Sequence, residues 1–238
     1  MAVMLNNQDV EAVLDMPACI DALYQGLKSY VRGDAARRPR IDLFAPTSRR
    51  DEFACFSSME GIIKNCYYAI RINPAVLSWP EIDGRRRRIT YTYQPGFEGG
   101  LVVVFRTENA ELVAIMNDGH LQRLRSGGMA ALGAKYLARQ DAAIAGILGS
   151  GRMARTFALG FATVRQLRKI KAYSPNAAGL ETYCKEMAKK LGIEVIPEKK
   201  PEDVVRGSDI VGCCTNSREP VVLGDWLEPG MYLANVSG

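Results

Sequence analysis

The sequence predicts an α/β protein with two lobes: an α+β lobe with mostly antiparallel strands, then a Rossmann-type doubly wound parallel sheet. In Phe53–Asn117, apolar residues recur with period two or in short bursts between turn residues, which is typical of antiparallel strands. After Asp141, strand-like and helix-like segments alternate, which is typical of a parallel sheet covered on both faces. A length of 238 residues fits two lobes, which we place at residues 1–121 and 122–238.

Two helices are expected at the start of the first lobe. Asn7 and Asp9 are helix-start residues for a short helix that ends near Leu14, and Pro17 begins a second helix that stops at Gly33. The expected strands that follow are Phe53–Phe56, Tyr67–Ile72, Ile89–Tyr93, Leu101–Arg106 and Leu112–Met116.

The second lobe follows a helix expected at Leu121–Arg139. Its expected strands are Ile144–Leu148, Ile170–Tyr173, Glu194–Ile196, Ile210–Cys214 and Tyr232–Val236. Its expected helices run from Arg152 to about Arg168, over Asn176–Leu191, and through KPEDVVRGSD (residues 200–209).

A glycine-rich turn at residues 149–154, GSGRMA, joins the first strand of this lobe to its first helix. In a G-x-G-x-x-A pattern the first glycine makes a tight turn and the second lets the backbone approach a pyrophosphate. The small Ala154 lets helix and strand pack closely, and the helix amides hold the phosphates. The strand–turn–helix setting favours a dinucleotide site over a structural corner. The residues expected to hold the cofactor here are Gly149, Ser150, Gly151, Arg152 and Met153.

The end of the next strand indicates which dinucleotide is preferred. An NAD site usually places an acid there to hold the ribose 2′-hydroxyl, but this segment reads KIKAYSPN and has no acid before Glu181. Lys171, Ser174 and Asn176 could accept a 2′-phosphate instead. The sequence therefore favours NADP over NAD.

Composition argues against several other classes of protein. The net charge of +5 is modest, and the one dense basic run is Arg85–Arg88. This run follows a hairpin turn at Asp83-Gly84, so we expect it to be a solvent-exposed part of a hairpin. No nucleic-acid partner is therefore expected. No stretch approaches the ~20 apolar residues of a membrane span. Six cysteines without C-x-x-C spacing suit reduced thiols in a cytoplasmic protein. A single histidine, His120, excludes a histidine-rich metal site.

Three arginines could hold a substrate carboxylate, because each offers a fork of donors. Arg125 lies in the helix expected at Leu121–Arg139, Arg40 follows Pro39, and Arg71 ends the strand CYYAIR. The same helix contains Gly127-Gly128, which costs about 1 kcal/mol per glycine relative to alanine. Tight helix packing and a close approach to a ligand explain this pair equally well.

The sequence resembles the ornithine cyclodeaminase/mu-crystallin family. LRSGGMAALGAKYLA is similar to that family's L-R-T-A-A-x-x-A-L-A-A-K-Y-L-A segment, and ILGSGRMA, AYSPN, VVRGSDIVGCCTNSREPVV and WLEPGMYLANVSG follow in the family's order. The resemblance implies a homodimer, with a first lobe that supplies the interface and substrate groups and a Rossmann lobe that binds the cofactor. Thr215 is a further residue expected to contact the cofactor.

The resemblance implies site residues as well. Arg125 matches the family arginine that grips the substrate carboxylate, and Arg40 matches a second one. Arg71 stands where cyclodeaminases have a lysine, and an arginine does not exchange protons as a tuned lysine does. We expect Arg71 and Arg125 to be the catalytic residues. Ser126 and Gly127 replace the usual Thr-Ala, and a family aspartate would lie beyond Gly238, so the chain is expected to be truncated at its C-terminal end.

These features predict an NAD(P)-dependent oxidoreductase that transfers a hydride to or from the carbon of a C=N or C–N bond in a small imino or amino acid. A cyclic ketimine reductase and an amino acid dehydrogenase both fit. The alternatives are an ornithine cyclodeaminase proper and a non-catalytic NADP-binding protein of the mu-crystallin kind. An esterase is disfavoured, because Ser126 and Ser150 have no histidine partner other than His120.

Overall fold

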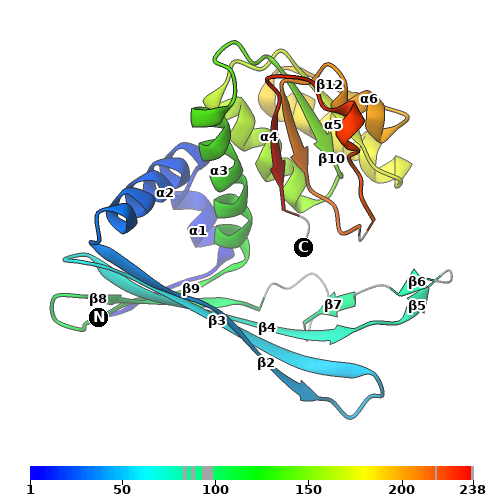
Figure 1. The fold of residues 1–238 in the computed structure, drawn as a ribbon. Coiled ribbons are helices and arrows are strands. Elements are labelled where there is room, and N and C mark those ends of the chain that lie inside the picture. Colours follow the sequence, from blue (N-terminus) through cyan, green and yellow to red (C-terminus); the bar gives the residue numbers. More distant parts are fainter. Residues whose placement is uncertain (83–84, 87–88, 93–98, 218, 237–238) are drawn as a thin grey trace. The chain divides into compact units, whose positions relative to one another are not determined.

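The chain folds into two compact units, which are described separately (Figure 1). The first contains residues 1–14 and 25–122, and the second contains residues 15–24 and 123–238. The computed structural model describes residues 1–82, 85–86, 89–92, 99–217 and 219–236. The turn expected at Asp83-Gly84 and two residues of the basic run, Arg87 and Arg88, lie outside these residues.

The first unit is built on one twisted sheet with the strand order β1-β9-β8-β4-β3-β2, and β7 pairs with β4. All pairs in it are antiparallel except β1 with β9. Its strands are β1 (Val3–Leu5), β2 (Ala35–Pro46), β3 (Glu52–Ile63), β4 (Tyr67–Ser78), β7 (Ile89–Tyr91), β8 (Leu101–Arg106) and β9 (Leu112–Asn117). A separate two-stranded ribbon contains β5 (Glu81–Ile82) and β6 (Arg85–Arg86).

Two prolines mark where this sheet extends beyond the expected strands. Strand β2, which the sequence analysis missed, is an edge strand, and Pro39 lies at a register shift between Arg38 and Ile41. A bulge on an edge strand tolerates a residue without an N–H group. In β4, Pro74 lies between the residues that pair with β8 and those that pair with β7, so its missing N–H group interrupts neither of these two ladders.

Helix α1 (Asn7–Val13) begins with a reciprocal cap. The side chain of Asn6 accepts hydrogen bonds from the amides of Gln8 and Asp9, and the carboxylate of Asp9 accepts one from the amide of Asn6. The Asn6 side chain satisfies two otherwise unpaired amides and the Asp9 carboxylate satisfies one, which fixes where the helix starts. Helix α2 (Met16–Val31) follows directly.

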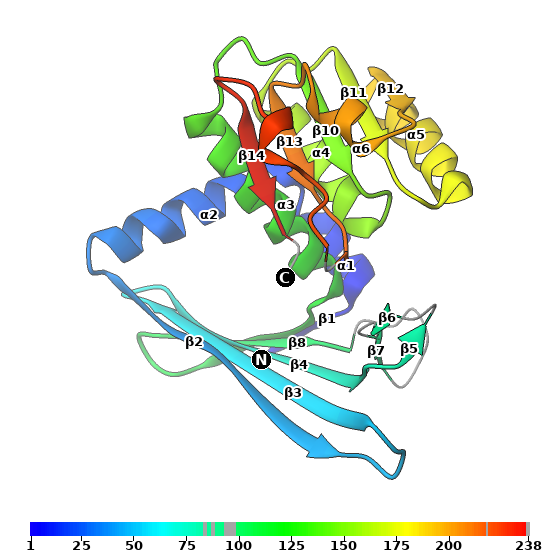
Figure 2. The same ribbon diagram turned by 45° about the vertical axis from the view of Figure 1, so that its right-hand side comes forward.

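The second unit is the doubly wound parallel sheet that the sequence predicts, with the order β12-β11-β10-β13-β14. Helices α4 and α5 cover one face and α6 the other (Figure 2). The strands are β10 (Ile144–Leu148), β11 (Lys169–Tyr173), β12 (Glu194–Pro197), β13 (Ile210–Cys213) and β14 (Tyr232–Asn235). The helices are α4 (Arg152–Val164), α5 (Ala177–Leu191), α6 (Pro201–Val205), the 3₁₀ turn η1 (Gly224–Trp226) and the part of α3 (Gly119–Leu137) from residue 123 onward.

The two adjacent glycines of α3 serve helix packing. A Cβ on Gly127 would lie 2.5 Å from the carbonyl oxygen of Thr156 in α4, and one on Gly160 would lie 2.8 Å from the carbonyl oxygen of Gly127. A Cβ on Gly128 would lie 3.0 Å from a methyl carbon of Leu23. Of the two explanations left open by the sequence, the structure supports close helix contact at both positions.

Helix α4 ends at Val164, four residues earlier than expected, and Arg165 is extended. The guanidinium of Arg165 is buried and donates to the carbonyl oxygens of Ala134, Lys135 and Ala138 at the end of α3. The chain therefore leaves α4 where this side chain can cap a neighbouring helix.

All six cysteines carry free thiols. Within the part of the chain that the structure describes, no helix combines the length and the apolar character that crossing a bilayer requires.

Candidate functional site

The glycine turn (residues 149–154) joins the end of β10 to the start of α4. Gly149 has a φ of +117°, and a Cβ on it would lie 2.4 Å from the carbonyl oxygen of Cys214. Its amide donates to the carbonyl oxygen of Tyr173 over 2.8 Å. Backbone conformation and the close approach of the chain after β13 both require glycine here.

The start of α4 has the properties of an anion site. Gly151 is the N-cap residue, no side chain caps the helix, and nothing lies within 4 Å of the position that a Cβ on Gly151 would take. The first amides of a helix lack acceptors within the helix and carry the positive end of its dipole. A phosphate here could accept from the amides of Gly151, Arg152 and Met153. The turn therefore fits a dinucleotide pyrophosphate.

The side chains of the turn separate into packing and exposed groups. Ala154 is fully buried, and its carbonyl oxygen accepts a hydrogen bond from the hydroxyl of Tyr183 over 3.4 Å. Ser150 and Met153 are half-buried, and Arg152 is exposed at the first helical position. The small residue at the third motif position thus allows α4 to lie close to the sheet, as the pattern predicts.

The residues expected at a 2′-phosphate lie at and after the end of β11. Asn176 is the N-cap of α5, where its Oδ1 accepts from the amide of Gly179, and Ser174 Oγ accepts from the amide of Asn176. Lys171 lies elsewhere: its ammonium group donates to the carbonyl oxygens of Asp203 and Arg206 at the end of α6. Lys171 would have to leave these carbonyls to reach a phosphate.

Thr215 lies two residues beyond β13. It directly follows Cys214, whose carbonyl oxygen would lie 2.4 Å from a Cβ on Gly149 in the glycine turn. Its Oγ1 accepts from the amide of Ser217 over 2.8 Å, which makes a local turn of this loop. The hydroxyl retains its own proton for a hydrogen bond to an acceptor.

Arg40 and Arg71 line one cavity of about 230 Å³ in the first unit. Arg40 extends from β2, where its Nη2 donates to Ser57 Oγ over 2.7 Å and its Nε donates to Asp42 Oδ1 over 2.7 Å. The apolar part of the lining comes from Met59, Gly61, Ala69 and Val102. The structure therefore brings two of the three expected substrate-binding arginines together.

Arg71 is a buried cation. Its Nε donates to Asp118 Oδ2, and the two side chains are only 10% and 2% exposed. Its Nη2 is buried and has no hydrogen-bond partner among the described residues. Because the side chain of Arg71 is part of the cavity lining, its positive charge would attract an anion bound there. Arg71 can act there as a fixed positive charge.

Asp118 is a site residue that the sequence analysis missed. It lies directly before α3, which begins at Gly119, and its carbonyl oxygen accepts from the amide of Gln122. An aspartate at a helix start is a recognisable signal. Its ion pair with Arg71, 47 residues away in sequence, is a long-range contact that this local signal does not reveal.

Arg125 lies on α3 and belongs to the second unit. It is half-buried and close enough to Cys19 to affect that thiol. Burial raises the pKa of Cys19, and the charge of Arg125 opposes this effect. The structure thus places Arg125 with α2 residues of its own unit, and its meeting with Arg40 and Arg71 stays a prediction.

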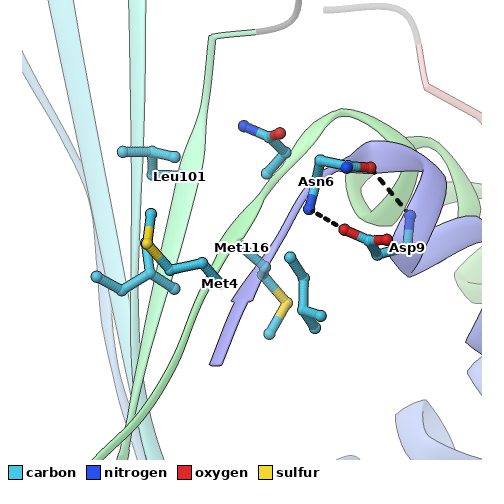
Figure 3. Close-up of a pocket in the computed structure, with 8 residues that line it drawn as sticks. Met4, Asn6, Asp9, Leu101 and Met116 are labelled. Carbon is cyan, nitrogen blue, oxygen red and sulfur yellow. Dashed lines mark hydrogen bonds between the residues drawn. The ribbon is translucent and has the colours of Figure 1, made fainter. Parts of the chain in front are cut away.

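A second cavity of about 230 Å³ in the first unit differs in chemistry (Figure 3). Met4, Leu101 and Met116 supply apolar walls, and Asn6 and Asp9 lie at one side. The polar groups of Asn6 and Asp9 already bond one another in the cap of α1. This cavity therefore offers an apolar surface and lacks the guanidinium groups of the first.

Comparison with known proteins places these features in context. The ornithine cyclodeaminase/mu-crystallin family matches residues 96–238. A putative dehydrogenase of Rhizobium meliloti is 27% identical over 225 residues, which are 94% of this chain and 62% of that protein. The chain thus spans less than two thirds of this relative's length.

Two solved structures share the fold. The Δ¹-pyrroline-2-carboxylate reductase of Thermococcus litoralis, in complex with NADH and L-proline, is 24% identical with a TM-score of 0.80, over 99% of this chain and 68% of that one. An archaeal alanine dehydrogenase dimer with bound NAD is 19% identical with a TM-score of 0.78, over 98% and 66%. Because the family matches more than half of the residues, this chain belongs to the ornithine cyclodeaminase/mu-crystallin family.

Proposed function

We propose that the protein is an NAD(P)-dependent oxidoreductase that acts on a small imino or amino acid. The glycine turn carries this proposal, because Gly149, Gly151 and the uncapped start of α4 form a cradle suited to a pyrophosphate. The relatives give it direction: one is a putative dehydrogenase, and the Thermococcus enzyme is an imino acid reductase.

The cofactor we favour is NADP, with NAD as the alternative. Gly149, Ser150, Gly151, Arg152 and Met153 would hold the pyrophosphate, and Thr215 would lie near the same turn. Ser174 and the Nδ2 group of Asn176 offer donors for a 2′-phosphate, and Lys171 would join them only after rearrangement. When bound, the nicotinamide supplies or accepts the hydride.

The substrate would be held by its carboxylate. Arg125 and Arg71 are the groups we assign to catalysis, with Arg40 as a further binding residue. Arg71 would supply a positive charge beside the cavity, and its hydrogen bond to Asp118 holds the guanidinium in place. These residues contribute by orienting the reacting carbon and keeping it in one position, which is largely positioning catalysis.

The arginine at position 71 also bears on the type of reaction. A lysine with a tuned pKa can give and take protons near neutral pH, whereas a guanidinium stays charged. Reduction of an imino acid, or dehydrogenation of an amino acid, is therefore favoured over cyclodeamination of ornithine. The remaining candidate from another class is an NADP-binding protein without turnover, of the mu-crystallin kind.

The assembly we propose is a cytoplasmic homodimer, with residues 1–121 as the substrate and interface lobe and residues 122–238 as the cofactor lobe. One face of the first unit's sheet supports self-association, because it exposes several large apolar side chains on neighbouring strands. Its members are Ile41, Leu43, Phe56, Ile62, Ile72 and Leu101.

The test is to mix the protein with NADPH or NADH and a series of cyclic imino acids, and to follow cofactor absorbance. We expect NADPH consumption with at least one of them, and about a 100-fold or larger loss of kcat/KM in Arg125→Met, as for a lost ionic contact to a carboxylate. A protein that binds NADPH but consumes it with none of these substrates favours the non-catalytic alternative. Cyclisation of ornithine would instead support the cyclodeaminase.

A further inference from the structure

Arg155 lies in the first turn of α4, and its guanidinium folds back beneath the glycine turn. Nη1 donates to the carbonyl oxygen of Ser150 over 2.8 Å and to that of Gly151 over 3.1 Å. These are the two carbonyl groups just before the helix. The contact therefore reaches the backbone of the proposed phosphate-binding turn itself.

The remaining donors of Arg155 are held from the neighbouring helix. Nε and Nη2 both donate to Glu186 Oε2 of α5, over 2.8 and 2.6 Å. The guanidinium also lies 5.6 Å from the centre of the Tyr183 ring, and this tyrosine is fully buried. With one edge on a carboxylate and one face on a ring, Arg155 has little freedom to turn.

The geometry of the peptide unit connects these contacts to the cofactor. In a trans peptide the carbonyl group of one residue and the amide N–H of the next point in opposite directions within one plane. Holding the carbonyl of Ser150 fixes the N–H direction of Gly151, and holding the carbonyl of Gly151 fixes that of Arg152. These two N–H groups are among the donors assigned above to the pyrophosphate.

If Arg155 served only to link α4 to α5, its hydrogen bonds to the two carbonyl groups would not be needed. The ion pair with Glu186 alone would link the two helices. Gly151 has no side chain to restrain its own backbone, and no side chain caps α4. The turn therefore depends on an outside group for its orientation.

We propose that Arg155 is a positioning residue for the phosphate-binding turn: it fixes the amides of Gly151 and Arg152 toward a pyrophosphate, and Glu186 and Tyr183 hold it in place. This inference rests on the proposed function, because it takes the glycine turn as a dinucleotide site. Arg155 acts through the backbone and makes no contact of its own with the cofactor.

The experiment measures ligand binding to the full chain by calorimetry, with ADP-ribose, which contains the pyrophosphate, and 2′-AMP, which lacks it. For Arg155→Met we expect Kd for ADP-ribose to rise about tenfold, equivalent to about 1.4 kcal/mol, and Kd for 2′-AMP to change less than about twofold. Arg206→Met is the matched control, because it removes an Arg–Glu pair with Glu202 on α6, away from the turn. It should bind both ligands as the wild type does.

Amide hydrogen exchange without ligand gives a readout that does not depend on binding. In Arg155→Met, exchange at Gly151 and Arg152 should accelerate while the amides of β10 keep their protection. Glu186→Gln, which keeps the carbonyl contacts and weakens the anchor, should give a smaller change of the same kind. It serves as the test variant if Arg155→Met does not fold.

The outcomes separate the two proposals. If the wild type binds neither NADPH nor ADP-ribose, the proposed dinucleotide site is wrong. If the wild type binds ADP-ribose and Arg155→Met binds it equally well, with unchanged exchange at Gly151 and Arg152, the positioning role alone is overturned. An equal loss of affinity for ADP-ribose and 2′-AMP also contradicts it, because that pattern indicates general loosening of the unit.

Discussion

Asp118 Oδ2 accepts a hydrogen bond from Nε of Arg71 over 2.5 Å, with both side chains almost fully buried. The carboxylate also explains the glycine opposite it: a Cβ on Gly100 would lie 2.9 Å from Asp118 Oδ2. The loop before β8, the middle of β4 and the start of α3 therefore meet at one ion pair. A substitution here affects both the fold and the proposed carboxylate site.

Removal of Asp118 should be strongly destabilising. Asp118→Ala leaves the Arg71 guanidinium buried without its carboxylate, which typically costs about 3–5 kcal/mol. The free energy of unfolding from urea titrations measures this loss. Glu111→Gln is the control, because Glu111 and Arg106 form a pair with both side chains more than 40% exposed, for which a change below about 1 kcal/mol is expected. If Asp118→Ala lowered the free energy of unfolding as little as Glu111→Gln does, the role of the buried pair would be contradicted.

Gly127→Ala should destabilise the second unit even though alanine favours helix. The new Cβ would lie 2.5 Å from the carbonyl oxygen of Thr156, so α3 and α4 must separate, at a cost of about 1–3 kcal/mol. Gly26→Ala in α2 is the matched control, since nothing lies within 4 Å of its Cβ position; it should gain up to about 1 kcal/mol. Thermal unfolding should therefore shift in opposite directions for the two variants, and a shift in the same direction would refute the packing argument.

Arg165 should stabilise the end of α3. Its guanidinium donates to the carbonyl oxygens of Ala134, Lys135, Ala138 and Arg139, at and just after the end of α3. Arg165→Met removes all of these hydrogen bonds and should cost about 2–4 kcal/mol. Arg168→Met, three residues on and exposed, should change the free energy of unfolding by less than about 0.5 kcal/mol. Equal effects of the two variants would exclude a specific cap.

The second unit was predictable because its signals are local. The glycine turn, the alternation of strands and helices, and the sheet type follow from residues adjacent in sequence. The strands of the first unit were harder to predict. Strand β2 is an exposed edge strand whose sequence pattern is interrupted by Pro39, and Pro74 interrupts the pattern of β4 before its second half. Asp118 shows the same limit at the site, because its partner Arg71 is brought to it only by the antiparallel pairing of β4, β8 and β9.

Asp209 gives a pH-dependent contribution to stability with a defined sign. Burial opposes its ionisation, but hydrogen bonds from the amides of Ala143 and Ile144 and the charge of Arg139 outweigh burial and lower the pKa of this carboxyl. Because the pKa is lower in the folded state, the ionised carboxyl stabilises the fold. This stabilisation is complete at pH values above the unfolded pKa of about 3.9, and it is lost as the pH falls through the folded pKa.

Asp209→Asn should therefore be less stable than the wild type by about 2 kcal/mol near neutral pH, and the difference should shrink as pH falls below about 4. Urea unfolding at a series of pH values measures it. Asp141→Asn is the control, because the carboxylate of Asp141 is 83% exposed at 3.8 Å from Arg139. A difference between Asp209→Asn and wild type that grows as the solution is acidified would show that the sign is wrong.

Self-association should depend on the apolar face of the first unit's sheet. Leu43 and Phe56 are cross-strand neighbours on β2 and β3, and they are 69% and 54% exposed. Leu43→Glu places a charge at this pair, and burying an unpaired carboxylate in an interface is costly enough to separate the subunits. Light scattering should show a dimer for the wild type and a folded monomer for Leu43→Glu.

Val31→Glu is the matched control for this last experiment. Val31 lies on α2, is 85% exposed, and is not part of the sheet face, so the same charge should leave the dimer intact. Circular dichroism establishes that each variant is folded before its mass is compared. A monomeric wild type would overturn the proposed homodimer, whereas a dimeric Leu43→Glu would move the interface away from this face, because no close-packed apolar contact tolerates a buried charge at its centre.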